Sequence, residues 1–113
     1  MRVAIAWFDY HDTDTFSRMS AVSALSFRQV MGIDPDLIQL AGPEKRQQKH
    51  WKADNTIKLQ GWIDYVERTD DDVLLIDADV LAVKDVRHVF ADMDFDVAIT
   101  TRSPDAYVGA VKM

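Results

Sequence analysis

The segment with the clearest capacity for chemistry is DVLLIDADVLAVKD, at residues 72–85. An aliphatic run from Val73 to Ile76 is followed by two carboxylates, Asp77 and Asp79. Residues two apart in an extended strand project to the same face, so both carboxylates are expected to point into one site. Two oxygen ligands on one side suit Mn²⁺ or Mg²⁺, which keep open positions for water and substrate phosphates. The spacing therefore predicts a metal site at Asp77 and Asp79.

A purely structural explanation of the same tripeptide stays open. Aspartate is common where strands end because it caps turns and following helices, and the chain contains 19 Asp and Glu residues. The context favours function, since an apolar strand comes before the motif and a short amphipathic segment, Val86 to Phe90, comes after it. Ligands gather at the carboxyl ends of strands in α/β sheets, which is where this motif would lie.

Strand and helix patterns alternate along the whole chain, which predicts one α/β domain over residues 1–113. Strands separated by helices imply right-handed crossovers and a mainly parallel sheet, here a three-layer, Rossmann-like sandwich. The aliphatic third strand is expected to be buried on both faces. The expected elements are strands at 2–7, 37–40, 73–76 and 97–101, and helices from 13–17 to Gly32, at 55–68 and at 86–90.

Apolar residues at helical spacing predict which face of each long helix packs inward. The second long helix is expected to begin at an N-cap, Asp54 or Asn55. The residues expected on the inner faces are Phe16, Met19, Val22 and Val30 in the first helix, and Ile57, Leu59, Trp62, Ile63 and Val66 in the second.

The motif and its flanks, IDADVLAVKDVRHVF at residues 76–90, resemble the Asp-x-Asp segment of glycosyltransferases with the GT-A fold. The likeness is greatest to the glycogenin-like and galactosyltransferase-like branch. In those enzymes the two aspartates hold Mn²⁺ against the diphosphate of a nucleotide-sugar, so the resemblance assigns Asp77 and Asp79 as ligands of Mn²⁺ or Mg²⁺. It implies a GT-A-like domain, a UDP- or GDP-linked sugar as donor, and glycosyl transfer to an unknown acceptor.

Further residues gain roles at the nucleotide-sugar. Phe8 and Asp9 follow the first strand, where Phe8 would stack on a base and Asp9 would accept a hydrogen bond from it; a turn and helix cap is the alternative. Lys58 matches a basic residue that such transferases carry before the Asp-x-Asp strand, where it neutralises the diphosphate, although a solvated lysine is equally compatible. Ala78 and Arg102 are the remaining residues that the resemblance places at the ligand. No residue is nominated as catalytic.

The chain departs from the family pattern in its last residues. A complete GT-A enzyme has a second half that supplies the acceptor site, whereas AYVGAVKM has no Asn beside Gly109. The chain is therefore expected to be the donor-binding N-terminal part of an enzyme, a short relative with little turnover, or one that needs a partner chain. Its segment Tyr107 to Met113 is expected to be poorly anchored or to leave an exposed sheet edge, which favours homo-oligomers.

Composition narrows the functional classes. A net charge of -6 argues against general nucleic-acid binding, and the absence of cysteine excludes disulfides and thiolate metal sites. No apolar run approaches a membrane span and no signal peptide is recognised, so a cytoplasmic location is expected. The basic segment at 44–52 is either a solvated loop or a loop over an anionic ligand.

Two other functions stay open. Phosphatases of the haloacid dehalogenase type also place Asp-x-Asp after an apolar strand, but normally on the first strand and before a small hydroxyl pair, whereas Val80 and Leu81 follow Asp79 here. A non-catalytic α/β interaction domain with an acidic pocket is the third possibility, because a fold alone specifies no function.

Overall fold

The computed structural model describes residues 1–10, 13–42, 51–91 and 94–99 of the chain. The elements follow one another as β1 (Arg2–Trp7), α1 (Thr15–Met31), β2 (Asp36–Gln39), α2 (Trp51–Glu67), β3 (Val73–Ile76) and α3 (Arg87–Phe90). The predicted alternation of strands and helices is therefore confirmed as far as α3. The predicted start of the second long helix is wrong, because α2 already begins at Trp51 and Asp54 lies within its first turn.

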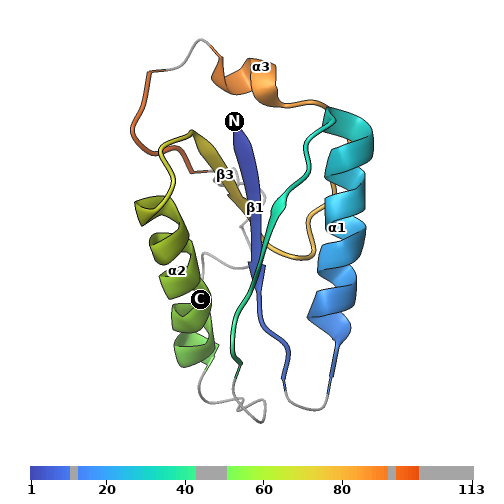
Figure 1. Ribbon diagram of the computed structural model, residues 1–113, viewed down its shortest axis with the longest axis vertical. Helices are drawn as coiled ribbons and strands as arrows, with labels where there is room; N and C mark the ends of the chain where they lie inside the picture. The colour runs from blue at the N-terminus through green and yellow to red at the C-terminus, as the bar shows by residue number, and fades with distance from the viewer. Residues whose placement is uncertain (11–12, 43–50, 92–93, 100–113) are drawn as a thin grey trace, which may run out of the picture.

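The three strands form one all-parallel sheet in the order β2-β1-β3. Ala4 pairs with Asp36 of β2 on one side and with Leu75 of β3 on the other. Helices α1 and α2 flank the sheet on opposite sides (Figure 1). The chain leaves β1 through α1 to reach β2, then crosses back through α2 to reach β3. The direction of winding thus reverses between β1 and β3, and open α/β sheets bind ligands in the crevice outside the carboxyl ends of such strands.

The core is centred on β1, whose residues from Val3 to Trp7 are all buried. Ile5 is fully buried, with 0% of its surface exposed. Phe27 and Met31 of α1 and Ile76 of β3 complete the same apolar cluster. A buried central strand between two covering helices gives the carboxyl ends of β1 and β3 a rigid support.

Helix α1 buries little of the face that its apolar residues predicted; of the four predicted residues, Met19 alone is partly buried and packs against the core. Its buried positions are Ser20, Ser23, Ala24, Phe27 and Met31, which recur every three or four residues. Phe16, Val22 and Val30 are instead exposed, with Val22 at 58%. Small serines allow the helix to approach the sheet closely, provided that their hydroxyls find hydrogen-bond partners.

Helix α2 buries only part of the face predicted for it, since Ile57 and Trp62 are half-buried as expected but the other three predicted residues are not. Leu59, Ile63 and Val66 are about half exposed, at 52%, 49% and 46%. The inward face is lined by the buried Gly61 and by half-buried residues at helical spacing: Asp54, Ile57, Lys58, Trp62 and Tyr65. A Cβ on Gly61 would lie 2.7 Å from the methyl groups of Leu40, so the glycine allows α2 to approach the end of β2.

The edge of the sheet differs from the expectation in two ways. Residues 97–99 form no strand, and the side chains of Val97 and Ile99 are 80% and 81% exposed; the rest of the predicted fourth strand lies outside the described residues. In the described part of the chain β3 is therefore an edge strand, and only its last residue, Ile76, is buried. The expectation of a strand buried on both faces is wrong. The expected exposed edge at Tyr107 to Met113 lies outside the described residues.

Asp85 and Arg87 form an ion pair at the start of α3, which is expected to make the stability of the fold depend on pH. Asp85 accepts hydrogen bonds from the Arg87 guanidinium and from the Arg87 backbone amide, at 3.0 Å for the latter, and these lower its pKa to about 2. Because the pKa is lower in the folded state, the stabilisation is complete above about pH 4, the ordinary aspartate range, and is lost as the pH falls to about 2. A carboxyl-carbon NMR titration should give a midpoint of about 2 for Asp85. In Arg87→Gln the midpoint should rise toward the ordinary value of about 4 without reaching it, because the backbone amide of residue 87 still donates to Asp85; an ordinary value in both proteins would contradict the pairing.

Candidate functional site

The Asp-x-Asp segment forms a turn at the carboxyl end of β3. The strand ends at Ile76, and the amide of Val80 donates to the carbonyl oxygen of Asp77 at 3.3 Å, which closes a four-residue turn. Within it, Ala78 is buried, with 5% of its surface exposed, and packs in the core cluster. The alternation of side chains in an extended strand therefore stops before Asp77, and the same-face argument from spacing does not apply to these two carboxylates.

Asp77 lies against α2. Its Oδ1 accepts a hydrogen bond from the Lys58 ammonium at 2.6 Å, in an ion pair whose side chains are 49% and 26% exposed, respectively. The same Nζ lies 5.4 Å from the centre of the Trp62 ring, within the range of a cation–π contact. Lys58, predicted to neutralise a diphosphate, is therefore at the Asp-x-Asp turn, and its charge is balanced there by Asp77.

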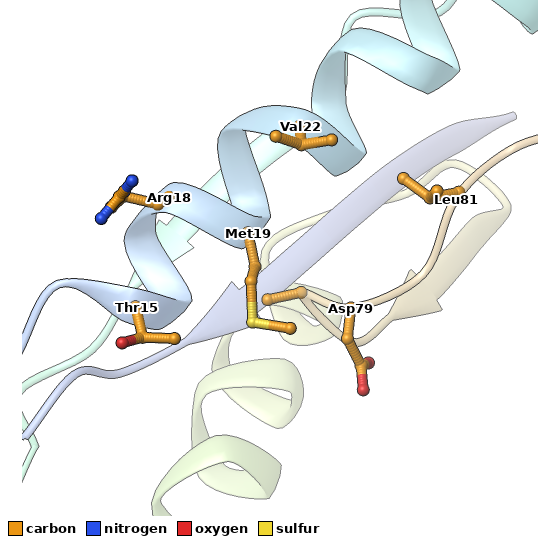
Figure 2. A pocket seen from close by; sticks show the side chains of 7 residues that line it. Thr15, Arg18, Met19, Val22, Asp79 and Leu81 are labelled. Carbon is orange, nitrogen blue, oxygen red and sulfur yellow. The ribbon is translucent and has the colours of Figure 1, made fainter.

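Asp79 faces the other helix. It borders an open hollow of about 470 Å³ between α1 and the segment after β3, in which the Met19 side chain extends toward Asp79 while Arg18 points away (Figure 2). The remaining lining is largely apolar: Thr15, Val22, Ala78 and Leu81. The expectation that Asp77 and Asp79 point together is thus not met, since one contacts α2 and the other borders the hollow beside α1.

Two serines of α1 fix the backbone that follows the turn. The Ser23 hydroxyl donates to the carbonyl oxygen of Val80 at 2.5 Å, and the amide of Ala82 donates to the Ser26 hydroxyl at 2.9 Å. Ser26 in turn donates to the carbonyl oxygen of Ser23 at 2.6 Å. Sequence reasoning missed these serines; the signal was their spacing, since Ser20 and Ser23 continue the helical face of Phe27 and Met31. The turn is consequently held by α1 while Asp77 is held by α2.

Asp9, in the loop after β1, binds the backbone amides at the amino end of α1. The Asp9 carboxylate accepts hydrogen bonds from the amides of Phe16 at 2.7 Å and Ser17 at 3.2 Å, and from the Ser17 hydroxyl, which also accepts from the Trp7 indole at 3.0 Å. Of the two roles predicted for Asp9, a base contact or a helix cap, these hydrogen bonds correspond to the helix cap. Because a carboxylate occupies these amides, the amino end of α1 is not open to a phosphate group. The Phe8 ring packs edge-on against Tyr10, with centroids 5.7 Å apart.

Gly42 brings the loops after β1 and β2 together at this end of the sheet. A Cβ at Gly42 would lie 2.4 Å from the carbonyl oxygen of Asp9 and 2.8 Å from the Phe8 ring. Gly42→Ala is therefore expected to lower the free energy of unfolding by about 1–3 kcal/mol, because a backbone atom cannot yield as a side-chain end does. Chemical denaturation measures the loss. Ala41→Ser, at the exposed neighbouring position, should change the free energy by less than about 0.5 kcal/mol; equal effects of both substitutions would contradict the close contact.

The turn offers two carboxylates to a cation, and in the structure they lie on different sides of it. Among the described residues no three His, Asp or Glu side chains come together as a metal-binding group. Mg²⁺ and Mn²⁺ are often held by only one or two carboxylates, with water and substrate phosphates completing the shell. Asp77 and Asp79 meet that requirement if their side chains reorient within the turn. Arg102, the remaining candidate, lies outside the described residues.

Comparison of the chain with protein-family models, with curated proteins and with solved structures gives no match. Within the described residues, no helix combines the length and apolar character needed to cross a membrane. Over residues 1–10, 13–42, 51–91 and 94–99, the class that the structure defines is a small α/β domain with a three-stranded, all-parallel sheet.

Proposed function

We propose that the chain is a GT-A-like, Rossmann-like domain that binds a UDP- or GDP-linked sugar together with Mn²⁺ or Mg²⁺. The observation that carries the proposal is the position of the Asp77–Val80 turn. It follows β3, directly beside β1, where the direction of winding reverses. Crevices at such reversals are where open α/β sheets bind nucleotides.

The charges at the turn support the same ligand. Asp77 and Asp79 supply two negative charges, which suit a divalent cation, and Lys58 supplies a positive charge 2.6 Å from Asp77, which suits a phosphate. A nucleoside diphosphate complexed with a cation offers both partners at once.

The loop after β1 would supply the base contact. Phe8 is partly exposed and follows the central strand at its carboxyl end, where its ring would stack on the base. Asp9 would take part indirectly in this proposal, because its carboxylate holds the amino end of α1 and so fixes the backbone beside Phe8. The residues of the chain thus bind and orient a donor, and the bound cation would stabilise the charge that develops on the leaving diphosphate.

Glycosyl transfer to an acceptor is the reaction that this donor site would serve. The described residues offer no group that we assign as a general base or nucleophile, and the acceptor class stays undefined. The proposal is therefore specific for the donor half of the reaction.

A thermal-unfolding screen with UDP, GDP, ADP, UMP and GMP, each with Mn²⁺, Mg²⁺ or chelator, tests the proposal. A ligand at about a hundred times its Kd stabilises by about 2.7 kcal/mol, which raises the Tm of a domain of this size by about 10 °C. We expect such a rise with UDP or GDP plus cation only, and a smaller one with the monophosphates. No rise with any nucleotide would exclude the proposed donor site, and release of phosphate from an aryl phosphate would favour the phosphatase alternative.

A further inference from the structure

Lys58 occupies the position on Asp77 that a bound cation would take. Its ammonium lies 2.6 Å from Asp77 Oδ1, the distance of a direct charge-assisted hydrogen bond. The lysine comes from the middle of α2, so its backbone is fixed by a helix of 17 residues, while its ammonium is carried on a flexible four-carbon stem. In the structure the negative charge of Asp77 is therefore already balanced by Lys58.

We propose that Lys58 and a divalent cation compete for Asp77, so that the site selects the cation–diphosphate complex over the free cation. This inference rests on the proposed function and specifies the form in which the ligand binds. A dication placed on Asp77 would face the ammonium at short range, and like charges repel, so the ammonium must leave. A free cation therefore binds more weakly, because part of its binding free energy is used to displace Lys58.

A diphosphate bound to the same cation offsets the free energy needed to displace Lys58. Once displaced, the Lys58 ammonium needs a new anionic partner, and a phosphate oxygen bound to the same cation supplies one within the reach of the side chain. Cation and diphosphate then strengthen each other's binding by the same factor, as linkage requires. A nucleoside without phosphates offers the displaced lysine no anionic partner, so it does not strengthen the binding of the cation.

The surroundings of Lys58 favour an anion at this position. The Trp62 ring lies 5.4 Å from the ammonium, within the range of a cation–π contact. The Trp62 indole nitrogen is buried and has no acceptor among the described residues. A buried donor without an acceptor is uncommon in native proteins, so this indole nitrogen, on the residue whose ring contacts the ammonium, is a second hydrogen-bond donor near Lys58.

Titration of the protein with Mn²⁺ alone, followed by electron paramagnetic resonance of the free ion, tests the competition directly. Lys58→Met removes the ammonium and keeps the apolar stem, so the affinity for Mn²⁺ alone should rise by about threefold to fivefold, the range expected for a partly exposed ion pair. With Mn²⁺ present, the same variant should bind UDP and GDP about tenfold more weakly, because the lysine no longer meets the phosphate. These two changes have opposite signs, which loss of folding would not produce.

Lys84→Met is the matched control, because it removes the same charge from an exposed lysine in the segment that follows the turn. It should leave both affinities within twofold of the wild-type protein, and Lys58→Arg, which keeps the charge, should retain the weaker Mn²⁺ binding. Unchanged or weaker Mn²⁺ binding by Lys58→Met, with Mn²⁺ bound by the wild-type protein, would overturn the competition and leave the proposed function standing. Mn²⁺ binding by neither protein would overturn the proposed function as well.

Discussion

Replacing both Asp77 and Asp79 with asparagine is expected to lower the affinity of the protein for Mn²⁺ by about a hundredfold or more. Two unit charges about 4 Å apart near a protein surface interact by about 4 kcal/mol, and about 1.4 kcal/mol is a factor of ten in affinity. The loss of two carboxylates beside a dication exceeds a hundredfold even after the cost of their desolvation is subtracted. Equilibrium dialysis with Mn²⁺, in the presence and absence of UDP, measures the change.

The double variant Asp70→Asn/Asp72→Asn is its matched control. It removes the same two charges from the exposed acidic residues that precede β3, at the opposite end of that strand. A general effect of net charge on cation binding would appear in both double variants, whereas a site at the turn predicts a large loss in the first alone. Similar, small losses in both would show that the carboxylates of the turn are ordinary surface groups.

Truncating Ile5 to alanine is expected to lower the free energy of unfolding by about 3–5 kcal/mol, the upper part of the range for buried aliphatic residues. Ile5 is fully buried in the central strand, where it pairs in register with Leu37 of β2 and Ile76 of β3. Neighbouring strands hold its backbone on both sides, so the cavity is not expected to collapse. Since domains are stable by only about 5–15 kcal/mol, the loss is a large fraction of the total.

Urea denaturation followed by circular dichroism measures this loss. Ile63→Ala makes the same chemical change on the outer face of α2, where the side chain is 49% exposed, and should lower the free energy by less than about 1 kcal/mol. Comparable losses at both positions would contradict the packing of β1 at the centre of the core.

The strands and helices were predictable because their patterns are local. The aliphatic runs at β1 and β3 and the turn residue Gly32, which ends α1 with a φ of 65°, identify their elements without help from the rest of the chain. Apolar spacing predicted the faces of the helices only in part, since Met19, Ile57 and Trp62 lie on the inward faces while the other predicted apolar residues are exposed. In α1 the buried face contains Ser20 and Ser23, whose hydroxyls donate to backbone carbonyls. Ser20 donates to Ser17, and Ser23 donates to Val80, which lies 57 residues away in the sequence.

The candidate site was predictable in its location and less so in its geometry. The motif placed Asp77 and Asp79 at the end of an aliphatic strand, but the rule of alternating faces failed because the chain turns immediately after Ile76. The Lys58–Asp77 pair joins residues 19 apart on different elements, and no local pattern in a single sequence encodes such a contact. Val97 and Ile99 have strong strand propensity, yet a strand also needs a neighbour to pair with, and propensity does not supply one.

Calorimetric titration of UDP and GDP into the wild-type protein and into Asp79→Asn, each with Mn²⁺ and with chelator, tests the central claim most directly. Asp79 has no hydrogen-bond or ion-pair partner within the described part of the structure, so its replacement by the isosteric asparagine leaves the fold intact and isolates its role toward the cation. The account predicts measurable binding of at least one nucleotide to the wild-type protein with Mn²⁺, and much weaker binding in the other three conditions. Equal affinities in all four conditions would contradict it and would leave the aspartates with a structural role alone.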